Sequence, residues 1–331
     1  MAIIISSTNN KWWVWKTSTV VNEATILADV FDKKVLVIDL DQQCNLSQAL
    51  LWGDDYDANE NAWELFKSDS QMPVNELIVP VFKNLDIIPG KLDDVFLLES
   101  ELEVLHERIR DDIKPKLVSI WKEEIANKEG VSEILGTLDK IILDKEEWIR
   151  VLKRRLSEID SEYDYIFLDL PPSVSRVPKN AWMASDYLLI PISDYFALKW
   201  TEWLIRRMIE IKRDYNQDLK FIFFFNKAPL SSNLFWKDFL NKDYLEIVKE
   251  FIDAIWSNEA LGSVSHIMDN MIRFSADVER AYWKWQTLID KEKWIKTLRQ
   301  KQKKGFKNKD KIKVLEDYKN FAKELIEITE K

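Results

Sequence analysis

A lysine and two hydroxyl side chains, Lys16, Thr17 and Ser18, begin a helical pattern directly after a short polar loop. The loop follows a β-branched apolar run, residues 3–5, so the local order is strand, loop and helix. Backbone N–H groups at the start of a helix attract anions, a lysine there reaches the β- and γ-phosphates, and a hydroxyl group meets Mg²⁺. These residue types in this order predict a phosphate-binding loop.

Three tryptophans stand in this loop where glycines are needed. Residues 11–18 read KWWVWKTS, with Trp12, Trp13 and Trp15 between the two lysines. A phosphate cradle requires close approach of the backbone and positions with φ > 0, and a Cβ atom is unfavourable at both. As printed, the indoles fill the phosphate space, and the chain is expected to bind nucleotide poorly.

With glycine at these three positions the segment reads KGGVGKTS. That string resembles the deviant Walker A motif of the ParA/MinD family of partitioning ATPases, including the additional Lys11, and the flanking NN and TSTVVNEATILA also resemble this family. The resemblance implies a nucleotide site made by eight consecutive residues, Lys11, Trp12, Trp13, Val14, Trp15, Lys16, Thr17 and Ser18.

The tryptophans have three possible explanations: ordinary buried aromatics in a loop that binds nothing, deliberate inactivation, or a decoding artefact. UGA is read as tryptophan in some bacterial codes and as glycine in others. The chain has 6 Gly and 15 Trp in 331 residues, and the two together approach the glycine content of about 7% in ordinary proteins. Trp200 also stands where the family usually has glycine, and the stretch AYWKWQTLI reads more naturally as AYGKGQTLI. The composition favours the artefact, with glycine at 12, 13, 15 and 200.

Acidic residues follow a second apolar run, residues 34–40 (KVLVIDL), which ends in Asp39 and Asp41. Acids at the carboxyl end of a strand lie at the ligand edge of an α/β sheet. The family motif at this place implies that Asp41 orients the attacking water and that Asp39 is a candidate metal ligand. Simple capping of the strand end is the alternative for both.

A third acid, Asp169, ends the apolar run YIFLDLPP at residues 165–172. This run resembles the Walker B strand of the family, and a carboxylate there holds Mg²⁺ directly or through water. The candidate metal ligands are therefore Thr17, Asp39 and Asp169. Asn226 ends a later run, FIFFF, and the resemblance places it near the adenine; a turn residue is the alternative.

Apolar runs alternate with helical patterns throughout, which predicts a mostly parallel twisted sheet with helices on both faces, the α/β fold of P-loop NTPases. The predicted strands are residues 3–5, 34–40, 85–90, 165–172, 187–193 and 221–225. We expect one domain over residues 1–331, with a helical insertion at about 92–160 that either contacts a partner or is a passive layer. A final helix is predicted at 314–328.

The net charge of −9 is unevenly distributed, because residues 291–313 carry 11 Lys or Arg against two acids. Such a segment suits nucleic acid or an anionic membrane, although a solvated charged surface is the alternative. A single cysteine, no long apolar run and no visible signal sequence predict a cytoplasmic protein without a transmembrane segment. The resemblance to the ParA/MinD family further implies association with the nucleoid.

The resemblance implies ATP and Mg²⁺ as cofactors and slow ATP hydrolysis in chromosome or plasmid partitioning. Lys16 would hold the phosphates, and Lys11 would reach the nucleotide of the second subunit in an ATP-dependent homodimer. Non-specific DNA and a ParB-like activator would be the partners. The alternatives are a MinD-like membrane-associated ATPase and a nucleotide-free adaptor that keeps the fold, as the printed tryptophans suggest.

Overall fold

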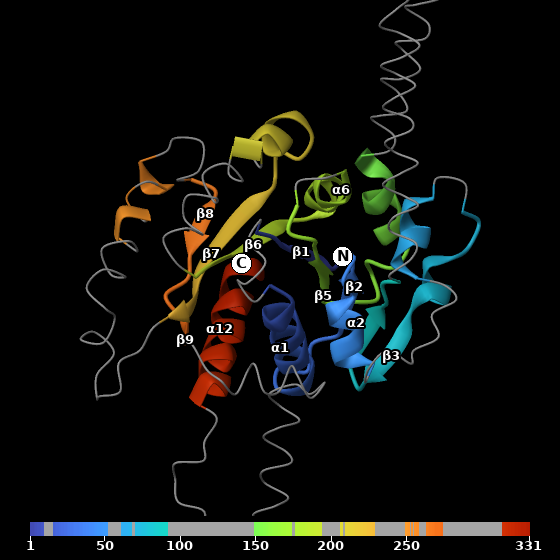
Figure 1. Ribbon diagram of the computed structural model, residues 1–331, viewed down its shortest axis with the longest axis horizontal. Coiled ribbons are helices and arrows are strands. Elements are labelled where there is room, and N and C mark those ends of the chain that lie inside the picture. The colour runs from blue at the N-terminus through green and yellow to red at the C-terminus, as the bar shows by residue number, and fades with distance from the viewer. Residues whose placement is uncertain are drawn as a thin grey trace, which may run out of the picture.

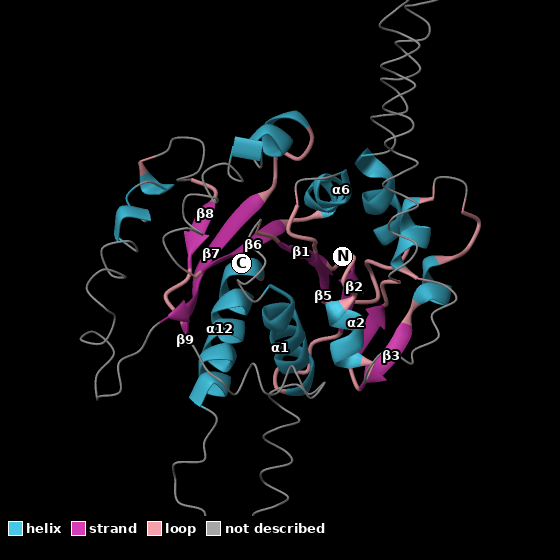
Figure 2. Cartoon of the chain, viewed as in Figure 1, coloured by secondary structure: helices cyan, strands magenta, loops and turns pink. Residues whose placement is uncertain are grey.

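The structure is a computed structural model, in which helices pack on the two faces of one large sheet (Figures 1 and 2). The residues it describes are 1–9, 16–51, 61–67, 70–91, 149–173, 176–193, 206–207, 209–228, 249–251, 253, 255–257, 263–273 and 313–331.

Within the described residues, nine strands form the sheet in the order β3-β4-β2-β5-β1-β6-β7-β8, with β9 beside β7. All neighbours are parallel except β3 and β4. The strands are β1 (Ile3–Ser7), β2 (Val35–Asp39), β3 (Val79–Phe82), β4 (Leu85–Ile88), β5 (Tyr165–Asp169), β6 (Tyr187–Ile192), β7 (Lys220–Ala228), β8 (Ser265–Ile267) and β9 (Ile272–Arg273). The predicted mostly parallel sheet is confirmed.

Helices cover both faces of this sheet, as predicted (Figure 2). The labelled helices are α1 (Lys16–Asp29), α2 (Asn45–Leu50), α6 (Arg176–Ala184) and α12 (Lys313–Thr329), with short 3₁₀ helices at Ala62–Phe66 and Val74–Leu77. Residues 149–156, 209–214 and parts of 249–256 are also helical.

The central strands are apolar on both faces because each face packs against helices. In β2, Val35 and Val37 belong to the core cluster that contains α1 and α12, whereas Leu36 and Ile38 belong to the cluster that contains α6. Helices α1 and α12 lie side by side on the first face, and α6 covers the opposite face (Figure 1).

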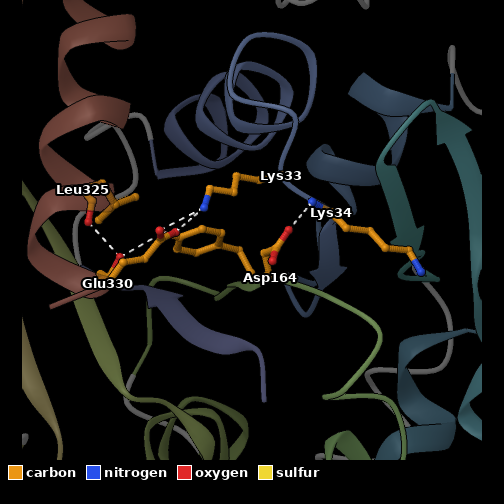
Figure 3. A network of polar contacts seen from close by, with 7 residues as sticks. Lys33, Lys34, Asp164, Leu325 and Glu330 are labelled. Atoms are coloured by element: carbon orange, nitrogen blue, oxygen red, sulfur yellow. Dashed lines mark hydrogen bonds and ion pairs between the residues drawn. The ribbon is translucent and has the colours of Figure 1, made fainter.

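Helix α12 runs in the same direction as α1, and its final turn is fastened at the amino edge of the sheet. Glu330 lies 2.7 Å from Lys33, which follows α1, and accepts a hydrogen bond of 2.8 Å from the hydroxyl of Tyr165 at the start of β5. In Figure 3 these groups form one polar network, beside the bond from the Lys34 amide to Asp164. The opposite end of α12 therefore lies near the carboxyl edge, where α1 begins.

The predicted strands that begin at residues 3, 34, 85, 165, 187 and 221 are all present, and the predicted final helix corresponds to α12. Strands β3, β8 and β9 were not predicted. Three and two residues are too few for a periodic pattern in β8 and β9, and β3 contains Pro80, which argues against a strand. Of the insertion predicted at about 92–160, residues 149–156 are helical, and residues 92–148 lie outside the described residues. The single domain over 1–331 stays a prediction.

Candidate active site

Three polar side chains form a row across neighbouring strands at the carboxyl edge of the sheet. In the parallel register, Asp169 of β5 is opposite Ser7 of β1 on one side and opposite Asp39 of β2 on the other. Register partners in parallel strands point to the same face, and here that face carries α1. All three side chains are fully buried. The fold thus concentrates polar groups under the start of α1.

Asp169 is the carboxylate of this row with unused acceptors. Neither of its oxygens has a hydrogen-bond partner of normal geometry, and the hydroxyl of Ser7 also lacks one. Burial, followed by the nearby charges of Asp39 and Asp41, raises the pKa of Asp169 well above its usual range. The Thr17 hydroxyl and the Lys16 ammonium oppose this rise in pKa, which means that both lie close to the carboxylate.

Lys16 lies at the first position of α1, directed toward this row of acids. It is 5% exposed, and its ammonium group donates a hydrogen bond of 3.0 Å to the backbone carbonyl of Asn9. Burial lowers the pKa of Lys16, while the carboxylates of Asp169 and Asp41 raise it. A buried cation at a helix N-terminus suits a ligand with several negative charges.

Asp39 uses its carboxylate to organise the start of α2. One oxygen accepts from the amide and the hydroxyl of Ser47 at 2.8 and 2.6 Å, and the other accepts from the Asp41 amide at 3.2 Å. The Ser47 hydroxyl in turn accepts from the Gly90 amide at 2.9 Å, which ties α2 to the end of β4. Burial raises the pKa of Asp39 to about 7, although the bonds from Ser47 lower it. These contacts are those of a strand-end cap, and the role of Asp39 as a metal ligand stays a prediction.

Asp41 lies on the turn between β2 and α2 and is also buried. It accepts a hydrogen bond of 3.0 Å from the amide of Gln43. Burial raises the pKa of Asp41. The positive charge of Lys16 is close enough to oppose that rise. Cys44 ends the turn in the left-handed conformation with φ 50°, directly before α2.

Asn226, in the C-terminal half of β7, is fully buried. Its side-chain amide donates a hydrogen bond of 3.3 Å to the hydroxyl of Thr19, one turn after Lys16. The structure therefore connects the predicted base-contacting residue to α1. Thr19, Ser47 and Ser7 were missed by the sequence reasoning, because single hydroxyl residues without a motif carry no recognisable signal.

Several predicted residues lie outside the described residues. They are Lys11, Trp12, Trp13, Val14, Trp15, Trp200 and residues 291–312 of the basic segment 291–313, whose last residue begins α12. Ser18 is described and buried in the first turn of α1, where its carbonyl accepts a hydrogen bond of 2.7 Å from the side chain of Asn22.

A protein-family model described as an AAA domain matches residues 2–145 and 131–221, which together span about two thirds of the chain. The chain belongs to this family. Both matched stretches carry site residues, Lys16 and Asp41 in the first and Asp169 in the second. The predicted membership of the ParA/MinD group is confirmed by this match and by the relatives below.

Two relatives come from bacteria. The chain is 29% identical over 220 residues to the sporulation initiation inhibitor protein Soj of Bacillus subtilis, covering 66% of this chain and 70% of Soj. It is 27% identical over 224 residues to the chromosome partitioning protein ParA of Myxococcus xanthus, covering 66% of this chain and 62% of that protein.

Solved structures support the fold at lower identity. A putative plasmid partition protein from Borrelia burgdorferi, bound to AMPPNP, is 20% identical with a TM-score of 0.56, covering 98% of this chain and all of that one. A McdA variant from Cyanothece in complex with ATP is 14% identical with a TM-score of 0.63, covering 98% and 96%. The predicted P-loop NTPase fold is confirmed.

The described residues fit a magnesium ion bound together with phosphate. Mg²⁺ commonly takes one or two carboxylates and completes its shell with phosphate oxygens and water. Asp169 offers two buried carboxylate oxygens without partners, and Thr17 lies beside it. In the described part of the chain, no three His, Cys, Asp or Glu side chains gather closely enough to hold a metal. A metal here would therefore depend on its ligand phosphates. Among the described helices, none is long and apolar enough to cross a membrane.

Proposed function

We propose that this chain, with glycine at positions 12, 13 and 15, is a ParA-like ATPase that partitions chromosomes or plasmids. The observation that carries the proposal is the pairing of buried Lys16, at the start of α1, with the partnerless carboxylate of Asp169. An orphaned buried carboxylate is costly in a folded protein unless a ligand completes it. Membership of the AAA-domain family and the likeness to Soj and ParA support this reaction class.

Phosphoryl transfer needs mainly positioning and charge neutralisation from the protein. Lys16 would hold the β- and γ-phosphates, and Asp41, on the turn beside it, would orient the attacking water. Thr17 and Asp169 would hold Mg²⁺, which neutralises phosphate charge when bound. Asp39 would hold the turn that carries Asp41 in place, because its oxygens accept hydrogen bonds from Ser47 and from the Asp41 amide.

Lys11 would contact the nucleotide of a second subunit, so that ATP joins two chains into a dimer. The dimer would bind DNA without sequence preference, and a ParB-like protein would stimulate slow hydrolysis. Asn226, beside Thr19, would contact the adenine.

The test compares two forms of the full chain, one as printed and one with Trp12→Gly, Trp13→Gly and Trp15→Gly. We expect the glycine form to bind ATP in the presence of Mg²⁺ and to hydrolyse it slowly, whereas the printed form binds neither ATP nor ADP. Adding Lys16→Ala to the glycine form is expected to abolish binding, and adding Lys33→Ala, outside the site, to leave it unchanged.

A glycine form that folds but has no ATP affinity would refute the ATPase and leave the nucleotide-free adaptor. Binding to anionic vesicles in place of DNA, by the ATP-bound glycine form, would identify the MinD-like alternative.

A further inference from the structure

The first turns of α12 hold β9 through a buried ion pair. The guanidinium of Arg273 donates to the two carboxylate oxygens of Asp317, from Nε at 2.5 Å and from the terminal nitrogen at 2.6 Å, and the Arg273 amide donates at 3.2 Å. The Asp317 side chain is only 2% exposed. Paired bonds of this kind fix both position and orientation.

A second carboxylate on the same face of α12, Glu324, holds the turn before β9. It accepts from the amides of Asp269 and Asn270 at 2.8 and 3.0 Å, and from the side chain of Asn270 at 2.6 Å. Asp317 and Glu324 are seven residues apart, which is two helical turns. The connection from β8 to β9 is therefore clamped to α12 at two points.

This clamp matters because β9 has only two residues and pairs irregularly with β7. So short a strand makes too few backbone hydrogen bonds to fix itself. Its pairing partner is Asn226, opposite Ile272. The part of β7 that carries Asn226 is thus held on one side by a strand that depends on α12.

The next residue of α12 reaches Asn226 by a second route. Tyr318 is fully buried beside α1, where burial and the nearby Glu23 raise its pKa and the hydroxyl of Thr19 opposes that rise. Thr19 is the residue that accepts the hydrogen bond from Asn226. Consecutive residues of α12 therefore contact the two structures that flank Asn226, namely β9 and the first turns of α1 (Figure 1).

We infer that Asp317 is a positioning residue for the purine base of the bound nucleotide: through Arg273 and β9 it fixes the side chain of Asn226. This inference rests on the proposed function for its ligand, but the mechanical coupling of α12 to Asn226 does not depend on nucleotide. Two experiments test the coupling of α12 to Asn226 and the role in base binding separately.

The first experiment measures hydrogen exchange in the full chain without nucleotide, in peptides that cover residues 220–228 and 265–273. Asp317→Asn is expected to speed exchange in both peptides, because loss of the ion pair releases β9 from β7. Glu316→Gln removes the same charge one residue earlier, on a side chain that is 60% exposed, and is expected to change neither. Faster exchange confined to 265–273 would overturn the coupling, and so would no change in either peptide.

The second experiment measures ATP and GTP affinity in the glycine form. Asp317→Asn is expected to weaken ATP binding about tenfold, the equivalent of one well-placed hydrogen bond, and to leave GTP affinity and kcat unchanged. In an Asn226→Ala background the same substitution should have no further effect on the ATP-to-GTP ratio, because residues that act through one contact are not additive. An equal loss for ATP and GTP, or additive effects, would refute the positioning role even where the exchange coupling holds.

If the glycine form binds no nucleotide, the proposed function fails and with it the role in base binding. The exchange experiment still decides whether α12 fixes Asn226. Arg273→Lys gives a second test variant that keeps the charge and loses the paired geometry, with an expected effect in the same direction and smaller.

Discussion

At the scale of single residues, Asp169 and Glu23 are both buried carboxyl groups without hydrogen-bond partners in the described part of the chain. Asp169 lies at the carboxyl edge beside Lys16 and Thr17, so a ligand can complete it. Glu23 lies inside α1, two turns from that edge, among apolar residues and Tyr318. The same degree of burial therefore indicates a ligand site at Asp169 and an uncompensated cost in stability at Glu23.

Glu23→Leu is expected to stabilise the fold by about 1–3 kcal/mol at pH 8, because it removes an orphaned polar group from the core. Burial raises the pKa of Glu23 well above its usual value of 4.5. The protonated group is therefore tolerated below that value, and stability is lost as the pH rises toward the folded-state pKa. The gain from Glu23→Leu should accordingly be smaller at pH 5 than at pH 8, as measured by urea unfolding.

Glu23→Gln is the matched control, since it keeps the size and polarity and removes the ionisation. It should flatten the pH dependence without the full gain in stability. Equal stability of the parent and of Glu23→Leu at both pH values would contradict the burial of an ionisable group here.

Two tryptophans of the described chain differ from those of the loop. Trp63 is 3% exposed and its indole donates to the Lys91 carbonyl at 3.3 Å, while Trp182 is fully buried within α6. The Trp182 indole N–H has no partner, at a cost of about 1–3 kcal/mol. Removing a buried tryptophan costs about 3–5 kcal/mol, and glycine inside a helix costs about 1 kcal/mol more. The cavity that glycine would leave costs more than the unpaired indole N–H of tryptophan, so we predict tryptophan at both positions.

Mass spectrometry of protein from its native source checks this assignment. Peptides that contain residues 12, 13 and 15 are expected to have the mass of glycine, and those that contain 63 and 182 the mass of tryptophan. Glycine at 182 would mean that the core around α6 packs differently, and tryptophan at 12, 13 and 15 would remove the decoding explanation.

At the scale of elements, the Asp39–Ser47–Gly90 contacts join β2, α2 and the end of β4. Ser47→Ala is expected to destabilise the protein by about 1–3 kcal/mol, because the buried Asp39 loses a donor and the Gly90 amide loses its acceptor. Thermal unfolding measures this loss. Ser157→Ala, at an exposed hydroxyl, provides the control and should change stability by less than about 0.5 kcal/mol.

The sequence was sufficient for elements with a strong local pattern. Residues 34–40 and 165–172 were predictable because both faces of a central parallel strand are buried, which gives uninterrupted apolar runs at 35–38 and 165–168. The acids Asp39, Asp41 and Asp169 were predictable because strand ends converge on one edge. Strand β9 and the Asp317–Arg273 pair were not, since a two-residue strand and a contact over 44 residues leave no periodic trace.

At the scale of the whole molecule, charge is separated along the chain. Residues 291–313, which end at the first residue of α12, hold a net charge of +9, and the rest of the chain carries about −18. Under the proposed function, this segment, of which residues 291–312 lie outside the described residues, provides the DNA contact. Such a contact weakens with salt because bound counterions are released from DNA.

Replacing Lys301, Lys303 and Lys304 by Gln in the ATP-bound glycine form is expected to reduce the slope of log affinity against log salt by about 3, or about one for each lost phosphate contact. Fluorescence anisotropy with duplexes of two unrelated sequences measures it, and both duplexes should respond alike. Lys319→Gln together with Lys323→Gln, on α12, removes two charges outside the segment. An equal change of slope in that control would place the DNA contact elsewhere.

The turn between β2 and α2 contains the only cysteine of the chain, Cys44. Its thiol is 3% exposed and packs close to Gly90, three residues after Asp41. A thiol reagent can therefore reach it only when this turn opens. The rate of Cys44 alkylation therefore measures how often this turn, which also carries Asp41, opens, and the measurement needs no engineered cysteine.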